Sequence, residues 1–259
     1  MKDTILQKLL DIEASENVRV LYACESGSRA WGFESPDSDW DVRFIYVRPR
    51  DHYLGLRPLE DTIERTDGDL DIVGWDLRKT LLLASKSNPA LLEWLCSPAY
   101  MRDQKFTDCL SDILRDYDAH ALAHHYAGLA LKTYRIYWKF PGEHVKLKKY
   151  AYVLRPLLCL RYMQYADAAI PFVDFDRLMR YVDMPDRVRS EMGDWAHEKR
   201  RNGEQMTNSD LRFPAMEAYM IREIADARER ASAVPVGRSP NMAALNTLFL
   251  NTLGVLADD

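Results

Sequence analysis

Short apolar runs of the length of β-strands dominate the first part of the chain. They lie at residues 18–24, 42–47, 59–65 and 70–75. Between the last two runs, Asp67-Gly68 is a strong hairpin signal, because glycine adopts the backbone conformations that tight turns require. Ahead of the runs, Ile5, Leu9 and Ile12 follow the helical repeat. This pattern predicts one helix over residues 2–14, followed by strands that build a sheet.

Helical spacing replaces this pattern after Trp75. Asp76 is a suitable N-cap for a helix over residues 77–86, since its side chain can accept hydrogen bonds from the first free amides. Asn88-Pro89 opens the next predicted helix in the same way, with proline at the first helical position. From Gln104 onward the helical period dominates. We therefore predict an α/β core followed by an all-helical region.

Composition and charge are those of an ordinary globular protein. The chain has 259 residues and a net charge of −5, and its length allows one large domain or two small ones. The cysteines lack Cys-x-x-Cys spacing, which argues against a zinc site and favours free thiols in a reducing cytoplasm. No apolar run approaches the ~20 residues of a membrane span. We expect a soluble, cytoplasmic protein with no membrane partner; the sequence leaves its oligomeric state open.

Polar residues suited to catalysis stand at the ends of two predicted strands. Gly27-Ser28 follows the first run, and Asp39 and Asp41 open the next one after ten intervening residues. Alternate residues of a strand share a face, so the two carboxylates are expected to project together. Neighbouring carboxylates repel unless a cation lies between them, and hard oxygen ligands suit Mg²⁺. The turn adds amides and a hydroxyl that can bind phosphate.

Each half of this pattern is common by itself. Asp-x-Asp arises by chance in a chain with 40 acidic residues, and Gly-Ser is an ordinary turn. Their occurrence together, at the junctions of two strand-like runs, supplies the structural context that such a motif requires. Metal and phosphate ligands at this spacing indicate nucleotidyl transfer.

The pattern from Gly27-Ser28 to Asp39-x-Asp41 resembles the signature of the DNA polymerase β-like nucleotidyltransferase superfamily. Longer stretches resemble one branch of it, the predicted nucleotidyltransferases called RNA-ligase-associated proteins. These stretches are residues 27–33, 36–43, 74–79 and 86–89. The resemblance covers most of residues 18–100 and, more loosely, residues 146–161. It implies a polymerase β-like α/β (α+β) core with a mixed sheet, followed by an all-helical C-terminal region.

The change of pattern along the chain predicts two domains, and the resemblance implies a third carboxylate. Residues 1–117 are expected to form the catalytic core, and residues 118–259 a helical substrate-binding region. The return strand of the hairpin offers Asp69 and Asp71, which share a face. Asp71 is preferred because it lies between apolar neighbours, as the third acid of the superfamily does, whereas Asp69 adjoins the turn. Both can equally be exposed charges at a strand edge.

The implied mechanism uses two metal ions. Asp39 and Asp41 would bind one Mg²⁺ together with the triphosphate of a nucleoside triphosphate (NTP), and Asp71 would join them at the second ion. Asp71 could also accept the proton of the attacking hydroxyl. The remaining nucleotide ligands are expected to be Gly27, Ser28 and Arg29. The sequence leaves open whether Mn²⁺ can replace Mg²⁺ and which NTP is used.

A basic stretch over residues 132–161 contrasts with the acidic chain. Its cations are Lys132, Arg135, Lys139, Lys146, Lys148, Lys149, Arg155 and Arg161. Such a stretch attracts polyanions, and the aromatic residues within it can stack on bases. An amphipathic helix with a solvated charged face has the same composition. We expect Lys148 and Lys149, together with Arg155, to bind the triphosphate or an RNA end.

These features predict a Mg²⁺-dependent nucleotidyltransferase. It would transfer a nucleoside monophosphate (NMP) from an NTP to a hydroxyl acceptor and release pyrophosphate. The resemblance implies that the acceptor is an RNA end. Transfer of AMP to a protein or a small molecule is one alternative. The other is a catalytically quiet, antitoxin-like binding protein, against which the intact carboxylates argue, since binding alone does not need clustered acids.

Overall fold

The structure is a computed structural model that describes five stretches of the chain. They are residues 1–56, 60–138, 145–167, 169–202 and 213–254. The chain divides into two compact units, each formed by separate segments. The first consists of Met1–Gly27, Asp39–Asp118 and Arg238–Asp259. The second consists of Ser28–Ser38 and Ala119–Gly237.

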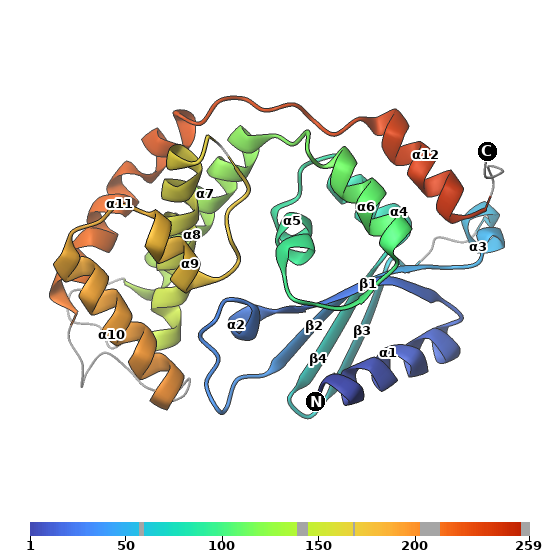
Figure 1. The fold of residues 1–259 in the computed structure, drawn as a ribbon, viewed down its shortest axis with the longest axis horizontal. Helices are drawn as coiled ribbons and strands as arrows, with labels where there is room; N and C mark the ends of the chain where they lie inside the picture. The colour runs from blue at the N-terminus through green and yellow to red at the C-terminus, as the bar shows by residue number, and fades with distance from the viewer. Residues whose placement is uncertain (57–59, 139–144, 168, 203–212, 255–259) are drawn as a thin grey trace. The chain divides into compact units, whose positions relative to one another are not determined.

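A five-stranded sheet forms the centre of the first unit (Figure 1). Its strands are β1 (Arg19–Ser26), β2 (Trp40–Val47), β3 (Thr62–Asp67), β4 (Leu70–Asp76) and β5 (Ala99–Arg102). They lie in the order β3-β4-β2-β1-β5. The strands β2 and β4 are parallel, and all other neighbours are antiparallel. The sheet is therefore mixed, as predicted.

Helices cover both faces of this sheet, because both faces carry apolar side chains. On one face, Ile5 and Leu9 of α1 (Lys2–Glu16) join a buried cluster that includes Ile72 of β4. Side chains alternate along a strand, so Trp75 points to the opposite face. There its ring stacks on Trp94 of α5 (Pro89–Cys96), with 3.8 Å between the ring centroids. The other helices of this unit are α3 (Arg50–Leu54), α4 (Leu77–Ala84), α6 (Gln104–Ile113) and α12 (Met242–Thr252).

The strongest local signals of the sequence are confirmed. Asp76 caps α4, since its side chain accepts a hydrogen bond of 2.8 Å from the amide of Arg78. Asn88 caps α5 in the same way. The hairpin turns at Gly68, whose φ of +59° is a conformation that other residues rarely adopt. The predicted strand before this turn began at residue 59; β3 begins at Thr62, and residues 57–59 lie outside the described part of the chain.

Two short elements of the first unit were not predicted. They are α3 and β5, which have five and four residues. A segment of this length is too short to reveal a period of two or of 3.6 residues. What makes β5 a strand is its antiparallel pairing with β1, a long-range contact that the local sequence does not encode.

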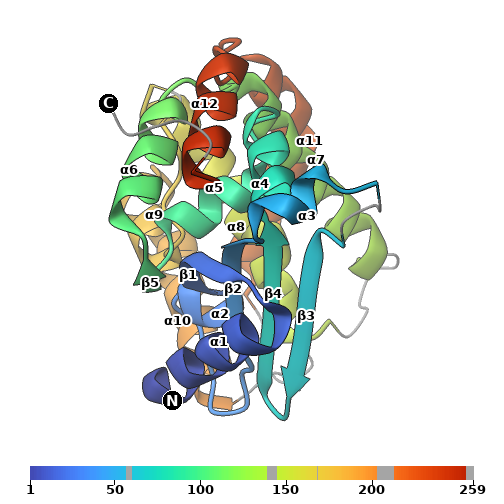
Figure 2. The same cartoon turned by 90° about the vertical axis from the view of Figure 1, so that its right-hand side faces the viewer.

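The last helix of the chain, α12, belongs to the first unit and packs on α4 and α6 (Figure 2). The ring of Phe249 meets Tyr53 edge-on at 5.3 Å between centroids, and the Arg78 guanidinium lies 5.5 Å from the Phe249 ring centroid. This grouping differs from the expected division, which assigned all of residues 118–259 to the second region. The sequence of an amphipathic helix shows that one of its faces must be buried. It does not show which surface of the protein covers that face.

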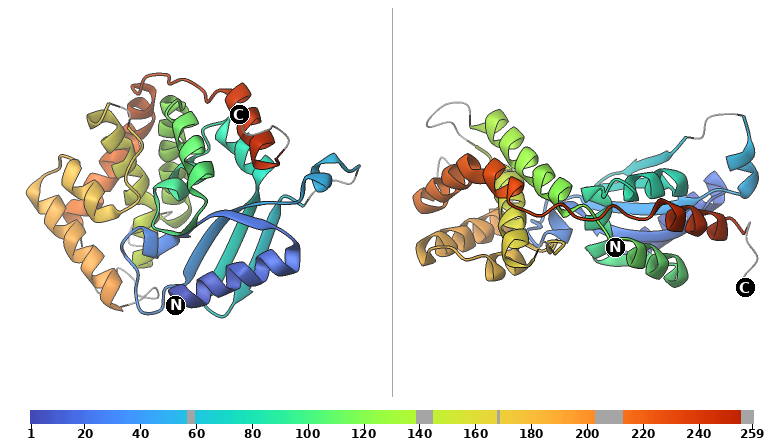
Figure 3. Two further views of the ribbon diagram at one scale, coloured as in Figure 1. Left: turned by 45° about the vertical axis from the view of Figure 1, so that its right-hand side comes forward. Right: turned by 90° about the horizontal axis from the view of Figure 1, so that it is seen from above.

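The second unit consists of helices. Its long members α7 and α8 pack along each other, and α11 packs on both (Figure 3). The helices are α7 (Ala119–Tyr137), α8 (Leu147–Tyr165), α9 (Phe175–Tyr181), α10 (Asp186–Asn202) and α11 (Pro214–Ser232). The predicted helical region is thus confirmed in its class. Across the described stretches of both units, no helix is long and apolar enough to cross a membrane.

The segment that links the Gly-Ser turn to Asp39 is grouped with these helices, and not with the sheet. The ring of Phe33 lies 5.1 Å from that of Phe175 and 5.6 Å from that of Trp195, centroid to centroid. The ammonium of Lys199, a residue only 1 % exposed, donates a 2.6 Å hydrogen bond to the carbonyl of Phe33. These contacts anchor residues 28–38 to α9 and α10, a second departure from the expected division at residue 117.

Removing the cap of α4 should destabilise the protein. Asp76→Ala is expected to lower the free energy of unfolding by about 2–3 kcal/mol, because it leaves the Arg78 amide and the buried Tyr53 hydroxyl without their acceptor. Asp76→Asn should cost less, since it keeps an oxygen acceptor and removes a carboxyl whose pKa is raised by burial. Urea unfolding at pH 7 measures both losses. Equal losses in the two variants would contradict this account.

Candidate active site

The parallel pairing of β2 with β4 sets Asp41 directly beside Asp71. Paired residues of neighbouring strands lie on the same face of a sheet, and the strands are about 4.8 Å apart. Both side chains are half-buried. The structure therefore brings together two carboxylates that the sequence places thirty residues apart.

Arg43 lies between these two carboxylates. It follows Asp41 by two positions on β2 and so projects from the same face. Its Nη2 atom is 3.0 Å from Oδ1 of Asp41 and 3.0 Å from Oδ2 of Asp71. Without a cation, two acids this close would repel, and one of them would tend to hold its proton. The guanidinium places a positive charge against both carboxylates and so offsets their repulsion.

The electrostatics of Asp41 show that a third carboxylate lies nearby. Burial raises the pKa of the Asp41 carboxyl above its ordinary value. The positive charge of Arg43 opposes this rise, whereas the negative charges of Asp71 and Asp39 add to it. Asp39 is exposed and lies one residue before β2. All three predicted acids thus interact electrostatically around Asp41, which is an environment that favours a cation.

The Gly-Ser turn meets the acidic pair at Gly27. Antiparallel pairing of β1 with β2 sets Ser26 opposite Asp41, and Gly27 follows with φ +60°. A Cβ atom at Gly27 would lie 1.9 Å from Oδ2 of Asp41, far inside contact distance. Only glycine can occupy this position without displacing the carboxylate. The two halves of the sequence motif therefore lie against each other at Gly27 and Asp41.

A further acid, Glu25, supports Asp41 and was not predicted. Its side chain is 5 % exposed. Oε1 accepts a 3.1 Å hydrogen bond from the backbone amide of Asp41, and Oε2 accepts one from the hydroxyl of Tyr100. Glu25 thereby fixes the start of β2. The only sequence signal is a charged residue directly after the apolar run of β1. A buried acid at such a position needs hydrogen-bond donors around it.

The register of the sheet distinguishes Asp71 from Asp69. Asp69 is exposed in the hairpin turn, and its backbone carbonyl accepts a 2.7 Å hydrogen bond from the amide of Trp40. Asp71 instead lies beside Asp41 and shares Arg43 with it. This geometry favours Asp71 as the third acid of the site.

Ser28 and Arg29, the other predicted phosphate ligands of the turn, belong to the second unit. They continue the short helix α2 (Gly27–Ala30). The carbonyl of Ser28 accepts a 3.0 Å hydrogen bond from the amide of Phe33, and Nη2 of Arg29 donates a 2.8 Å bond to the carbonyl of Ser38. Arg29 therefore closes the loop that follows the turn, and its role toward phosphate stays a prediction.

The cationic residues of the basic stretch differ in how far they are buried. Lys149 holds its ammonium 4.5 Å from the ring centroid of Tyr137 and 5.2 Å from that of Tyr152, and Lys148 is half-buried. Arg155 is 3 % exposed. Its Nε donates a 3.1 Å hydrogen bond to the carbonyl of Val173, and its guanidinium lies 4.7 Å from the Trp31 ring centroid.

Arg155 therefore packs inside the helical unit, and our expectation that it binds an anion from solution was wrong. An arginine between apolar neighbours has the same local sequence whether it is buried or solvated. Lys139 lies outside the described residues. For Lys148 and Lys149, binding of triphosphate or RNA stays a prediction.

The donor set around Asp41 is suited to a hard divalent cation. Carboxylate oxygens are the side-chain ligands that Mg²⁺ prefers. Within the described stretches, no group of three or more histidine, cysteine, aspartate or glutamate side chains is arranged to hold a metal ion, and Asp41 and Asp71 each contact Arg43 instead. A divalent cation at these carboxylates would compete with the guanidinium for the same oxygens.

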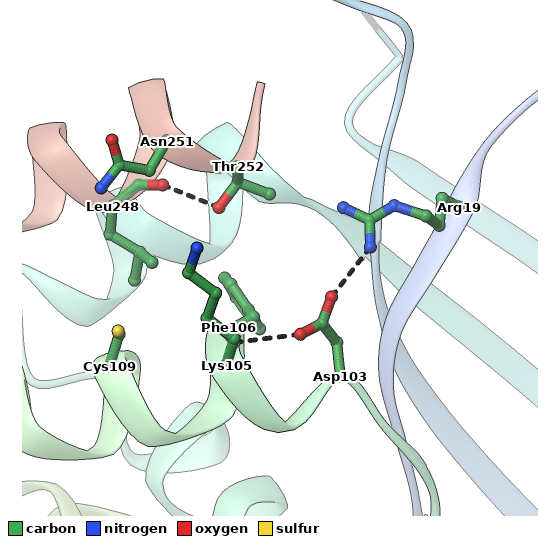
Figure 4. A pocket seen from close by; sticks show the side chains of 8 residues that line it. All are labelled: Arg19, Asp103, Lys105, Phe106, Cys109, Leu248, Asn251 and Thr252. Carbon is green, nitrogen blue, oxygen red and sulfur yellow. Dashed lines mark hydrogen bonds and ion pairs between the residues drawn. The ribbon is translucent and has the colours of Figure 1, made fainter. Parts of the chain in front are cut away.

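A cavity of about 170 Å³ lies at the other end of the sheet (Figure 4). Arg19, which opens β1, lines it and is held by Asp103 at 2.8 Å between Nη1 and Oδ2. Gly27 follows the opposite end of the same strand. The cavity is therefore separate from the acidic site.

A mixed sheet with a Gly-Ser turn after one strand and paired acids at the start of the next defines a DNA polymerase β-like fold. The chain belongs to RlaP, the RNA repair pathway DNA polymerase beta family, which matches residues 1–251. It is also 38 % identical over 256 residues to the uncharacterized protein YcgL of Bacillus subtilis (strain 168). That alignment covers 98 % of this chain and 96 % of the relative. The family and the fold class expected from the sequence are confirmed.

The contact between Gly27 and Asp41 can be tested by a side chain at Gly27. Gly68→Ala is the matched control, because Gly68 has nearly the same φ and nothing within 4 Å of an added Cβ. We expect the control to lose about 1–2 kcal/mol of unfolding free energy from backbone strain. Gly27→Ala should lose at least about 1 kcal/mol more, from overpacking. In an Asp41→Ala background, which removes the two closest atoms, this excess should shrink by at least half. An undiminished excess in urea unfolding would contradict the contact.

The raised pKa of Asp41 predicts a pH effect on stability. The pKa of Asp41 is higher in the folded state than in the unfolded state, where it is near 3.8. The contribution of Asp41 to the unfolding free energy therefore falls as the pH rises from the unfolded-state pKa through the folded-state pKa. Asp41→Asn does not titrate and escapes this loss. In EDTA at pH 7 its melting temperature should exceed that of the wild type, by about 2–4 °C for each kcal/mol gained. A lower melting temperature would contradict the prediction.

Proposed function

We propose that this protein is a divalent-cation-dependent nucleotidyltransferase that transfers an NMP from an NTP to a hydroxyl group of RNA. The observation that carries the proposal is the pairing of Asp41 with Asp71, with Asp39 close enough to raise the pKa of Asp41 and Gly27 against its carboxylate. Membership of a DNA polymerase β family in an RNA repair pathway supports the same reaction class and the same acceptor.

The metal ligands in this proposal are Asp39, Asp41 and Asp71. Mutual repulsion among these acids is relieved by a bound cation, which is why the donor set fits Mg²⁺. When bound, the metal supplies charge neutralisation on the phosphate oxygens and lowers the pKa of the acceptor hydroxyl. Without the metal, Arg43 keeps the carboxylates of Asp41 and Asp71 at a fixed separation.

The protein's own groups position the reactants and move one proton. The acceptor oxygen forms a bond to the α-phosphorus as the bond from that phosphorus to pyrophosphate breaks, and pyrophosphate leaves. Asp71 accepts the hydroxyl proton. The amides of the turn at Gly27 and Ser28 donate to the β- and γ-phosphates, and Arg29 adds charge there. Placement and charge stabilisation provide most of the catalysis in phosphoryl and nucleotidyl transfer.

A single labelling experiment tests the function and the acceptor together. Purified protein is incubated with each α-³²P-labelled NTP and Mg²⁺, with total RNA, total protein or a small-molecule extract as the acceptor pool. Wild type should label RNA. Asp41→Asn and Asp71→Asn should each reduce labelling at least about 100-fold, since each removes charge stabilisation from the transition state.

Asp69→Asn is the matched control, because Asp69 is an exposed carboxylate in the adjacent turn. It should label RNA at the wild-type rate. If label appears in the protein pool or the small-molecule pool, the acceptor is a protein or a small molecule and not RNA. Absence of label from every pool would refute the enzymatic proposal and leave a binding protein.

A further inference from the structure

A groove of about 580 Å³ runs along the helical unit between α7 and α11. It is lined by His124, Ala127, Gly128, Leu131, Lys132, Arg135, Ile136, Arg228 and Ser232. Pockets that bind small molecules or single nucleotides have volumes of about 300–1,000 Å³. The groove is therefore large enough for a nucleotide-sized group.

The groove is lined by three cationic side chains and by no acidic one. Lys132 and Arg135 come from α7, and Arg228 faces them from α11. Among the described residues, none of the three forms an ion pair. Their charges are therefore available to a ligand, in a protein whose net charge is −5. Such a local concentration of positive charge attracts a polyanion that the rest of the surface repels.

The floor of the groove is apolar. Gly128 and Leu131 lie on the same stripe of α7 as Arg135, at helical spacing. A Cβ atom at Gly128 would meet nothing within 4 Å, so the space above it is open. Ile136 is 46 % exposed. A ligand with both phosphate groups and flat apolar faces matches this combination of cations and apolar floor.

We infer that this groove binds a single-stranded segment of RNA, with its phosphates on Lys132, Arg135 and Arg228 and a base over Gly128. The choice of RNA, as opposed to another polyanion, rests on the proposed function. Single strands expose base faces that apolar side chains can cover, whereas a duplex keeps its bases stacked inside. An acidic peptide would pair with the cations, but only one with aromatic side chains also offers a flat group to place over the floor.

Two sets of variants test the two parts of the groove. Lys132→Gln, Arg135→Gln and Arg228→Gln are combined to remove the cations. The matched control combines Lys2→Gln, Arg201→Gln and Arg238→Gln, which are exposed cations elsewhere and give the same change in net charge. Gly128→Leu fills the floor. Gly193→Leu is its control, since Gly193 is also helical with nothing within 4 Å of an added Cβ.

Binding of a fluorescein-labelled 12-nucleotide RNA is measured by anisotropy, without NTP or metal, over a series of salt concentrations. The cation variant should bind at least about tenfold more weakly than its control at 0.1 M salt, and its slope of log K against log salt should be shallower by about 2. Gly128→Leu should weaken binding at least about threefold and should not lower the melting temperature. Both control variants should bind as the wild type does.

Equal binding by the cation variant and its control would overturn the inference, as would absence of RNA binding by the wild type. The inference would also be overturned if the protein bound inorganic polyphosphate or an RNA duplex as tightly as the single strand and Gly128→Leu had no effect. Because the assay needs no catalysis, its result is independent of the labelling experiment. If the cation variant loses RNA binding and no acceptor pool is labelled, the groove assignment stands. Only the proposal of enzymatic activity is then rejected.

Discussion

The acidic site depends on the repulsion between like charges held on adjacent strands. Parallel pairing forces Asp41 and Asp71 together, and a shift of either strand by one residue would turn its aspartate toward the apolar cluster under α1. Arg43 offsets this repulsion from the same face. The sheet thus holds the two carboxylates in place even though their proximity is unfavourable.

The close approach at Gly27 extends this constraint to the end of β1. The turn lies against the carboxylate of Asp41 because a residue without a side chain stands there in a left-handed conformation. Glu25 then holds the amide of Asp41 from the preceding strand. Gly27, Asp41 and Glu25 are therefore parts of one packed arrangement, so a substitution at one of them affects the position of the others.

Local chemistry made much of this fold predictable. The cap at Asp76 and the turn at Gly68 each depend on neighbouring residues only, and alternation along β2 predicted which face Asp41 shares. The contacts that were missed join distant parts of the chain. Glu25 needed Tyr100 as a donor, and the buried Lys199 binds a loop more than 160 residues away in sequence, which no periodicity reveals.

The return of α12 to the sheet unit has a consequence for how the protein is made. Its buried residues Leu245 and Leu248 complete the packing beside α4 and α6, yet they are translated after the whole helical unit. A nascent chain can fold the helical unit while the surface under α12 is still uncovered. The sheet unit would then be the last to complete its core, although its sheet is synthesised before the helical unit.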